Sequence, residues 1–139
     1  MRRFLVAAVV SCAFAVLGGG ERANAADPPL DSMQCDRAGE PGRVRCSVET
    51  LASAGKTIDW AEVEIVSVPD FVIALRGRVG PPDAASKEPS RWRFALGLAS
   101  KRTGRGEVVA RVRVVECTED KRCATRETRV ATDIVVGVP

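Results

Sequence analysis

The segment Glu107–Cys117, EVVARVRVVEC, decides the fold class, because its apolar and polar residues alternate with a period of two. Successive side chains of a strand point to opposite faces, so this pattern predicts a half-buried β-strand. One face carries Val108, Ala110, Val112 and Val114, and the other carries Arg111 and Arg113. A strand with one apolar face needs a second apolar layer to cover it, which indicates a sheet packed against another sheet or a helix.

Further stretches on both sides of this segment show the same alternation. The alternating residues are Val44, Cys46 and Val48; Phe71, Ile73, Leu75 and Val79; Trp92, Phe94, Leu96 and Leu98; and Val130, Thr132, Ile134, Val136 and Val138. In Ile58–Val68 the apolar register shifts after Trp60 and again at Val66. Such shifts indicate a β-bulge, an edge strand, or a strand covered on both faces.

No stretch shows a sustained helical period, so we expect little helix. Residues 26–41 contain three prolines and few apolar residues and predict an irregular N-terminal arm, and residues 80–90 predict a polar, proline-rich loop. The sequence therefore predicts an all-β domain over residues 42–139. Six to seven short strands with frequent turns are typical of an antiparallel, immunoglobulin-like β-sandwich.

The composition of the 139-residue chain excludes several function classes. It contains no histidine and no tyrosine, which excludes Ser-His-Asp and Cys-His catalysis and His-ligated metals or haem. Glu62 and Glu64 share a strand face with no sign of a cleft, so they indicate exposed sheet surface. The aromatic residues Trp60, Phe71, Trp92 and Phe94 are expected in the core.

The N-terminus has the organisation of a Sec-type signal peptide. A positive Met1-Arg2-Arg3 end precedes a 14-residue apolar run, and Ala23-Asn24-Ala25 provides a small-x-small site. We expect residues 1–25 to be cleaved near Ala25-Ala26, giving a periplasmic or secreted protein. The run is too short to span a bilayer readily, and no later segment reaches the necessary length, so no stable membrane span is expected.

Cleavage at this site would leave a nearly neutral domain. It removes three arginines and one glutamate, so the mature chain has 18 basic and 17 acidic residues and a net charge of +1. A neutral domain has little attraction for phosphate backbones, which disfavours nucleic acid as a partner. A local basic patch remains, which predicts either a docking site for an acidic partner or lipid headgroups, or a solvated outer face. It comprises Lys101, Arg102, Arg105, Arg111 and Arg113.

Four cysteines remain after cleavage: Cys35, Cys46, Cys117 and Cys123. An even number in an oxidising compartment predicts two disulfides, and local pairing is favoured over crossed pairing. A Cys35–Cys46 bridge would be structural, stabilising the domain by about 2–3 kcal/mol through closure of its loop. Neither pair has the spacing usual for structural zinc, so no metal or other cofactor is expected.

The pair Cys117 and Cys123 encloses five residues at the tip of a predicted hairpin. Directly opposed strand residues have Cβ atoms about 4.5–5.5 Å apart, wider than a relaxed disulfide, and strained exposed disulfides exchange more readily. Cys117 shares the face of Arg111 and Arg113, so solvent should reach it. Nearby acidic residues oppose Lys121 and Arg122, so no strongly acidified thiol is expected. The pair is either a redox centre or a structural staple.

The segment Val112–Cys123, VRVVECTEDKRC, resembles the active-site hairpin of the N-terminal immunoglobulin-like domain of the thiol:disulfide interchange protein DsbD. The preceding FALGLASKRTGRGEVVARV also fits that family, so the resemblance covers about the last 45 residues. It implies that Cys117 and Cys123 form a redox pair that exchanges electrons with a thioredoxin-like partner. It also implies that Asp70-Phe71 could shield the pair. The chain has Val115-Glu116 where the family has an aromatic residue and glutamine.

Two functions follow from these patterns. The first is an exported thiol–disulfide exchange domain that works through its Cys-x5-Cys hairpin. The second is a non-catalytic, disulfide-stapled module that binds a protein partner in the cell envelope through its arginine-bearing sheet. Whether the domain acts in catalysis depends on which of the two is right.

Overall fold

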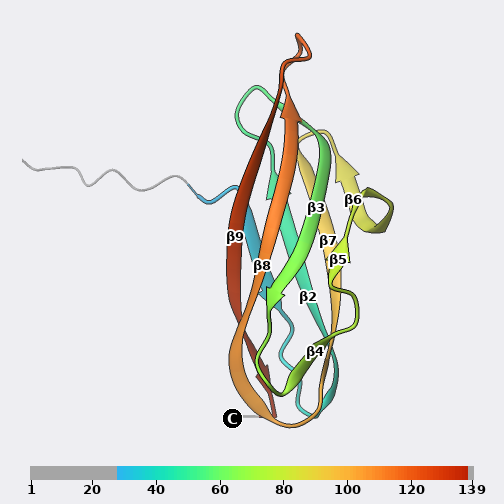
Figure 1. Ribbon diagram of the computed structural model, residues 1–139, viewed down its shortest axis with the longest axis vertical. Coiled ribbons are helices and arrows are strands. Elements are labelled where there is room, and N and C mark those ends of the chain that lie inside the picture. Colours follow the sequence, from blue (N-terminus) through green and yellow to red (C-terminus); the bar gives the residue numbers. More distant parts are fainter. Residues whose placement is uncertain (1–27, 138–139) are drawn as a thin grey trace, which may run out of the picture.

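Nine β-strands and one short 3-10 helix make up the regular structure of residues 28–137, the part of the chain that the computed structural model describes (Figure 1). The elements are β1 (Asp31–Cys35), β2 (Gly42–Leu51), β3 (Thr57–Ser67), β4 (Val72–Ala74), β5 (Arg78–Val79), η1 (Pro81–Asp83), β6 (Ala84–Glu88), β7 (Arg91–Ser100), β8 (Gly104–Cys117) and β9 (Cys123–Val136). The predicted signal peptide, its cleavage site and Val138 lie outside the described residues.

The strands form two antiparallel sheets that pack face to face. Sheet I has the order β1-β2-β7-β4. The short strand β6 also pairs with β7, on the same edge as β4, but it pairs with the first residues of β7 and β4 with the last. Sheet II has the order β5-β3-β8-β9. The predicted all-β sandwich is confirmed, whereas its assignment to the immunoglobulin type stays a prediction.

The core lies between the sheets and is built from the alternating residues of the central strands. The predicted inward residues of β2, β7 and β8 are all buried: Val44, Cys46, Val48, Trp92, Phe94, Leu96, Leu98, Val108, Ala110, Val112 and Val114. Ile134 and Val136 of β9 are fully buried as well. A period of two in the sequence therefore places one face of each long strand against the other sheet.

The predicted irregularity in Ile58–Val68 is confirmed as two β-bulges in β3. The pairing of β3 with β8 shifts register between Ile58 and Trp60 and again between Ile65 and Ser67. The first bulge turns Trp60 outward and returns Ala61 and Val63 to the core.

Two segments predicted to be irregular contain strands. Within residues 26–41, β1 pairs with β2 from Asp31 to Cys35, and within residues 80–90, β6 pairs with β7. The sequence of β1 shows no apolar alternation, because one of its inward residues, Asp31, is charged. β6 is an edge strand in which all residues are at least partly exposed, so it carries no apolar alternation.

The prediction that Phe71, Ile73, Leu75 and Val79 share one buried face is wrong. Phe71 and Val72 are both buried, whereas Ile73 and Leu75 are 43% and 46% exposed. The strand here, β4, is only three residues long, and residues 75–77 separate it from β5. The run is too short and too interrupted for one period to apply.

The longest feature of the fold is the β8–β9 hairpin, whose strands have 14 residues each. They pair without a register shift from Gly104 opposite Val136 to Cys117 opposite Cys123. The cysteine end of the hairpin projects from one end of the sandwich, at the top of Figure 1. The glycine end of β8 lies at the other end, beneath the β3–β4 connection.

At that end, glycines allow the β3–β4 connection to pack directly on β8. A Cβ atom added to Gly106 would lie 2.6 Å from Cβ of Pro69, and one added to Gly104 would lie 2.9 Å from the Phe71 ring. Both distances are shorter than a normal carbon–carbon contact, so the absence of side chains is required here.

Gly106→Ala should therefore destabilise the protein by about 1–3 kcal/mol, because the rigid Pro69 ring cannot move aside without shifting the backbone. Urea unfolding followed by tryptophan fluorescence measures the change. Gly77→Ala is the matched control, since its added Cβ would have no neighbour within 4 Å. Equal stability of the two variants would show that Pro69 does not pack on β8 in this way.

Candidate functional site

The structure joins the four cysteines as the local pairs Cys35–Cys46 and Cys117–Cys123. Each disulfide links residues that stand directly opposite each other in an antiparallel ladder, the first between β1 and β2 and the second between β8 and β9. The Cα atoms are 3.9 Å and 4.0 Å apart. The predicted local pairing is confirmed.

The two disulfides differ in their access to solvent. Cys46 is fully buried in the core and Cys35 is half-buried against it. Cys117 is half-buried and Cys123 is exposed. Since thiol–disulfide exchange requires a direct approach to sulfur, an external thiolate can reach the second disulfide far more easily than the first.

The five-residue loop between Cys117 and Cys123 is ordered by its own hydrogen bonds. The backbone N–H of Thr118 donates to the carbonyl of Arg122 at 3.0 Å, and that of Lys121 donates to the carbonyl of Thr118 at 2.9 Å. The N–H of Arg122 donates to Oγ1 of Thr118 at 3.3 Å. Lys121 has a φ of 59°, which closes the turn in the left-handed region.

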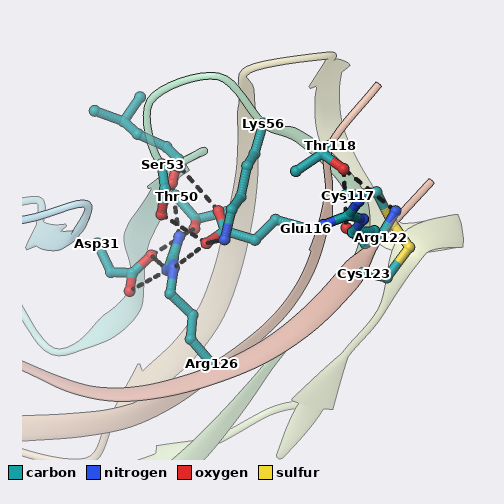
Figure 2. Close-up of polar contacts among 11 residues, drawn as sticks. Asp31, Thr50, Ser53, Lys56, Glu116, Cys117, Thr118, Arg122, Cys123 and Arg126 are labelled. Carbon is teal, nitrogen blue, oxygen red and sulfur yellow. Dashed lines mark hydrogen bonds and ion pairs between the residues drawn. A yellow bond between two sulfur atoms is a disulfide. The ribbon is translucent and has the colours of Figure 1, made fainter. Parts of the chain in front are cut away.

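Directly before the exposed disulfide, Glu116 points the opposite way, into the domain (Figure 2). Only 4% of the residue is exposed. Its carboxylate accepts hydrogen bonds from the backbone N–H of Ser53 at 2.8 Å and from the Ser53 hydroxyl at 2.6 Å. Nζ of Lys56 lies 3.9 Å from the same carboxylate. These contacts join the end of β8 to the loop between β2 and β3.

Arg126 of β9 links this carboxylate to a second buried one, Asp31 of β1 (Figure 2). Nε of Arg126 lies 3.8 Å from Oε1 of Glu116, and Nη1 donates a hydrogen bond to Oδ2 of Asp31 at 3.1 Å. Nη2 donates to the Leu51 carbonyl at 2.6 Å and to Thr50 Oγ1 at 3.1 Å. The Thr50 hydroxyl in turn donates to Asp31.

We refer to Asp31, Thr50, Ser53, Lys56, Glu116 and Arg126 as the Glu116–Arg126 cluster. It contains two carboxylates and two cations, so its formal charges cancel. Its members come from both sheets, and it lies beside the end of the sandwich from which the cysteine hairpin projects. Buried charges are tolerated when they are paired and hydrogen-bonded. Both carboxylates accept hydrogen bonds and Arg126 donates through Nη1 and Nη2, whereas its buried Nε has no hydrogen-bond partner.

The cluster lowers the pKa of Glu116 below its ordinary value of 4.5. Burial alone would raise this pKa, because it disfavours the charged form. The two hydrogen bonds from Ser53, with the charges of Arg126 and Lys56, outweigh burial and favour the carboxylate. Glu116 is therefore ionised at neutral pH.

The proposed shield over the cysteines, Asp70-Phe71, is not near them. Phe71 is buried over Gly104, and its carbonyl accepts a hydrogen bond from the Lys101 N–H at 2.8 Å. Asp70 forms an ion pair with Arg102 at 2.9 Å. Gly104 and Cys117 are the two ends of β8, so this prediction is wrong: the phenyl ring fills the core at the opposite end of the sandwich.

The basic patch expected on this hairpin is neutralised in part, because Arg102, Arg111 and Arg113 have carboxylate partners, whereas Lys101 and Arg105 have none among residues 28–137. Arg111 pairs with Glu64, Arg113 pairs with Glu127 at 3.4 Å, and Arg102 pairs with Asp70. Arg78 of β5 also pairs with Glu64, at 3.2 Å. Opposite charges stand opposite each other in the pairs Glu62–Arg113, Glu64–Arg111 and Arg113–Glu127, whereas Arg111 also stands opposite Arg129.

Sequence reasoning did not find the Glu116–Arg126 cluster, although one signal for it was present. Glu116 occupies the same face of its strand as Val112 and Val114, so its charge falls at a core position. Nothing in the local sequence connects it with Ser53, 63 residues earlier, or connects Arg126 with Asp31, 95 residues earlier.

No family model matches this chain, and a search of curated proteins finds no matching relative. Residues 28–137 contain no helix with the length and apolar character to cross a membrane. The same residues contain no cluster of three acidic or cysteine side chains that could hold a metal ion. The function is therefore argued from the geometry of the two disulfides and their surroundings.

Glu116→Gln should lower the free energy of unfolding at pH 7 by about 2 kcal/mol, because it removes a buried charged partner of Ser53, Lys56 and Arg126. A carboxylate whose pKa is lowered by folding stabilises the fold above its unfolded pKa. That contribution is lost as the pH falls through the lower folded pKa. The variant should therefore lose less stability than the parent as the pH is lowered from 7 to well below the ordinary glutamate value of 4.5.

Urea unfolding across that pH range measures both effects. Glu119→Gln is the matched control, since it makes the same change at an exposed position of the hairpin loop. If both variants keep the parent's pH dependence, Glu116 is not held ionised by its cluster.

Proposed function

We propose that this protein is an exported thiol–disulfide exchange domain in which Cys117 and Cys123 form the redox pair and a thioredoxin-like protein of the cell envelope is the partner. The resemblance of Val112–Cys123 to the DsbD hairpin supports the assignment. Two disulfides in a small domain support an oxidising compartment, where such bonds persist.

The observation that carries the proposal is that contacts other than the disulfide fix the register of the hairpin. Thirteen further residue pairs align β8 with β9 below the cysteines, since the ladder runs from Gly104 to Cys117. Glu116 fixes the end of β8 to Ser53, and Arg126 fixes β9 to β1 and β2. Opening the bond therefore frees two thiols at the tip and leaves the β-sandwich folded, as a redox centre requires.

The exchange step follows from the access to each sulfur. A thiolate of the partner attacks Sγ of the exposed Cys123, and the new mixed disulfide forms as the Cys117 sulfur leaves as a thiolate and takes up a proton. The second thiolate of the partner then attacks the partner's sulfur in the mixed disulfide. Cys123 leaves as a thiolate, which is also protonated. In this direction the partner dithiol becomes a disulfide, and two electrons and two protons pass to Cys117 and Cys123; the same steps in reverse pass them to the partner.

The other disulfide has a structural role in this proposal. Cys46 is part of the hydrophobic core, and Cys35 joins β1 to β2. A disulfide with one sulfur inaccessible to thiolates stays closed under conditions that open an exposed one.

The second candidate is a non-catalytic module in which both disulfides are structural and a surface of the sandwich binds a protein partner. It is favoured by an open hollow on the outer face of sheet I. Redox titration separates the two candidates, because only the first requires one disulfide to open reversibly.

Equilibration of the purified protein in glutathione buffers should open Cys117–Cys123 reversibly at potentials above about −250 mV while Cys35–Cys46 stays closed. Alkylation of free thiols and peptide mass spectrometry locate each cysteine's state. The closed pair is the internal control. Resistance of both pairs below about −300 mV would assign both disulfides to structure and contradict the exchange function.

Cys123→Ser should leave the sandwich folded with a loss of about 2 kcal/mol, the loop-closure contribution of a short bridge, and should abolish exchange with a thioredoxin-like protein. Cys46→Ser is the matched control and should cost about 1–3 kcal/mol more, because it places an unpartnered hydroxyl in the core. Urea unfolding gives the stabilities. The reverse order, with Cys123→Ser the more damaging, would identify the hairpin disulfide as the essential staple.

A further inference from the structure

The outer face of sheet I is hollowed. One open hollow of about 590 Å³ lies over β2 and β7 between Arg43, Leu75 and Gly97. A second, of about 570 Å³, continues from it toward β1 and β6 and shares Arg45 and Ala95 with the first. The hollows exist because the outward residues at the centre of the face are small: Ser32, Ser47, Ala95 and Gly97.

An apolar side chain forms one wall of the first hollow. Leu75 is 46% exposed, and its neighbour Ile73 on β4 is 43% exposed. The backbone N–H of Leu75 donates to the Gly97 carbonyl at 3.0 Å, which fixes the segment beside β7. A Cβ atom at Gly97 would lie 3.5 Å from Leu75 Cδ1, so the leucine lies directly over the glycine.

Charged side chains also line the first hollow: the arginines Arg37, Arg43 and Arg45, and the carboxylate Asp36. Arg45 pairs with Asp36 at 3.5 Å and Arg93 pairs with Glu49 at 2.7 Å. Neither Arg37 nor Arg43 has a carboxylate partner among residues 28–137. On the outer face of sheet II, Arg78, Arg111 and Arg113 have such partners, whereas Arg105 and Arg129 have none among the described residues.

We propose that these hollows bind an extended, acidic peptide segment of a partner protein. One aliphatic side chain of the segment would lie against Leu75 over Gly97, and its carboxylates would pair with Arg37 and Arg43. An open trough across several strands fits an extended chain better than an enclosed small molecule, and guanidinium groups are well suited to carboxylates. The site lies on the other sheet from the cysteine pair and does not depend on the proposed redox function.

A peptide array tests the proposal directly. Seven-residue peptides carry Gly, Val, Leu or Phe at the centre and Asp, Asn or Lys in the flanks, and fluorescence anisotropy measures their binding to the purified protein. The Asp-flanked Leu or Val peptides should bind about tenfold more tightly than their Asn-flanked or Gly-centred counterparts, because both the charge and the apolar contact contribute.

Variants assign the binding to this surface. The double variant Arg37→Ala/Arg43→Ala should weaken the best acidic peptide about tenfold, and Ala95→Leu should weaken it similarly by filling the floor between the two hollows. The matched control, Arg113→Ala/Arg129→Ala, makes the same change in net charge on the outer face of sheet II and should leave the affinity unchanged.

Three outcomes would overturn the proposal. They are equal affinity for Asp-flanked and Asn-flanked peptides, equal weakening by the two arginine double variants, and binding to phosphatidylglycerol vesicles with no binding to any peptide. The first outcome would show that carboxylates are not recognised. The second would show that the peptide does not bind at these hollows, and the third would identify a lipid surface as the occupant.

Discussion

The ion pairs of the Arg126 guanidinium hold together the end of the sandwich from which the cysteine hairpin projects. The guanidinium lies between the buried carboxylates of Asp31 and Glu116, which would each impose a large desolvation cost without a cation beside them. Because Asp31 belongs to β1 and Glu116 to β8, one side chain of β9 sets the position of the first strand relative to the second sheet. The same contacts fix the base of the cysteine hairpin. Hydrophobic burial makes the sandwich, but this ionic cluster determines how the two sheets meet beside the exposed disulfide.

The cluster also separates the roles of the two disulfides. Cys35–Cys46 lies partly in the core, where its sulfur atoms contribute to packing. Cys117–Cys123 lies beyond Glu116, outside the last charged contact that holds β8. Removing a bond at that position releases only five residues of loop, and these have hydrogen bonds of their own. This accessible position beyond the cluster suits the proposed exchange function, whereas a position inside the core does not.

Much of this fold follows from local sequence, because strand alternation is a local property. Trp92–Leu98 and Val108–Val114 reveal their buried faces directly, and the register shifts in Ile58–Val68 reveal bulges. Prediction failed where a charged residue faces inward, as Asp31 does, since its partner is 95 residues away in the chain. It failed again at Phe71, whose position depends on a glycine of another strand. The cysteines of the candidate site were found from their spacing, whereas the cluster supporting them depends on contacts that no local pattern encodes.

The two outer faces of the sandwich suit different roles for an electrostatic reason. On sheet II, Arg78, Arg111 and Arg113 already have carboxylate partners within the domain, although Arg105 and Arg129 have none among the described residues. An incoming acidic partner would have to displace those carboxylates and would gain little. On sheet I, Arg37 and Arg43 keep their donors available next to an apolar wall. A partner held there would leave the hairpin disulfide of sheet II uncovered, since the two features are on different sheets. Binding of one protein and electron exchange with another are therefore compatible within a single small domain.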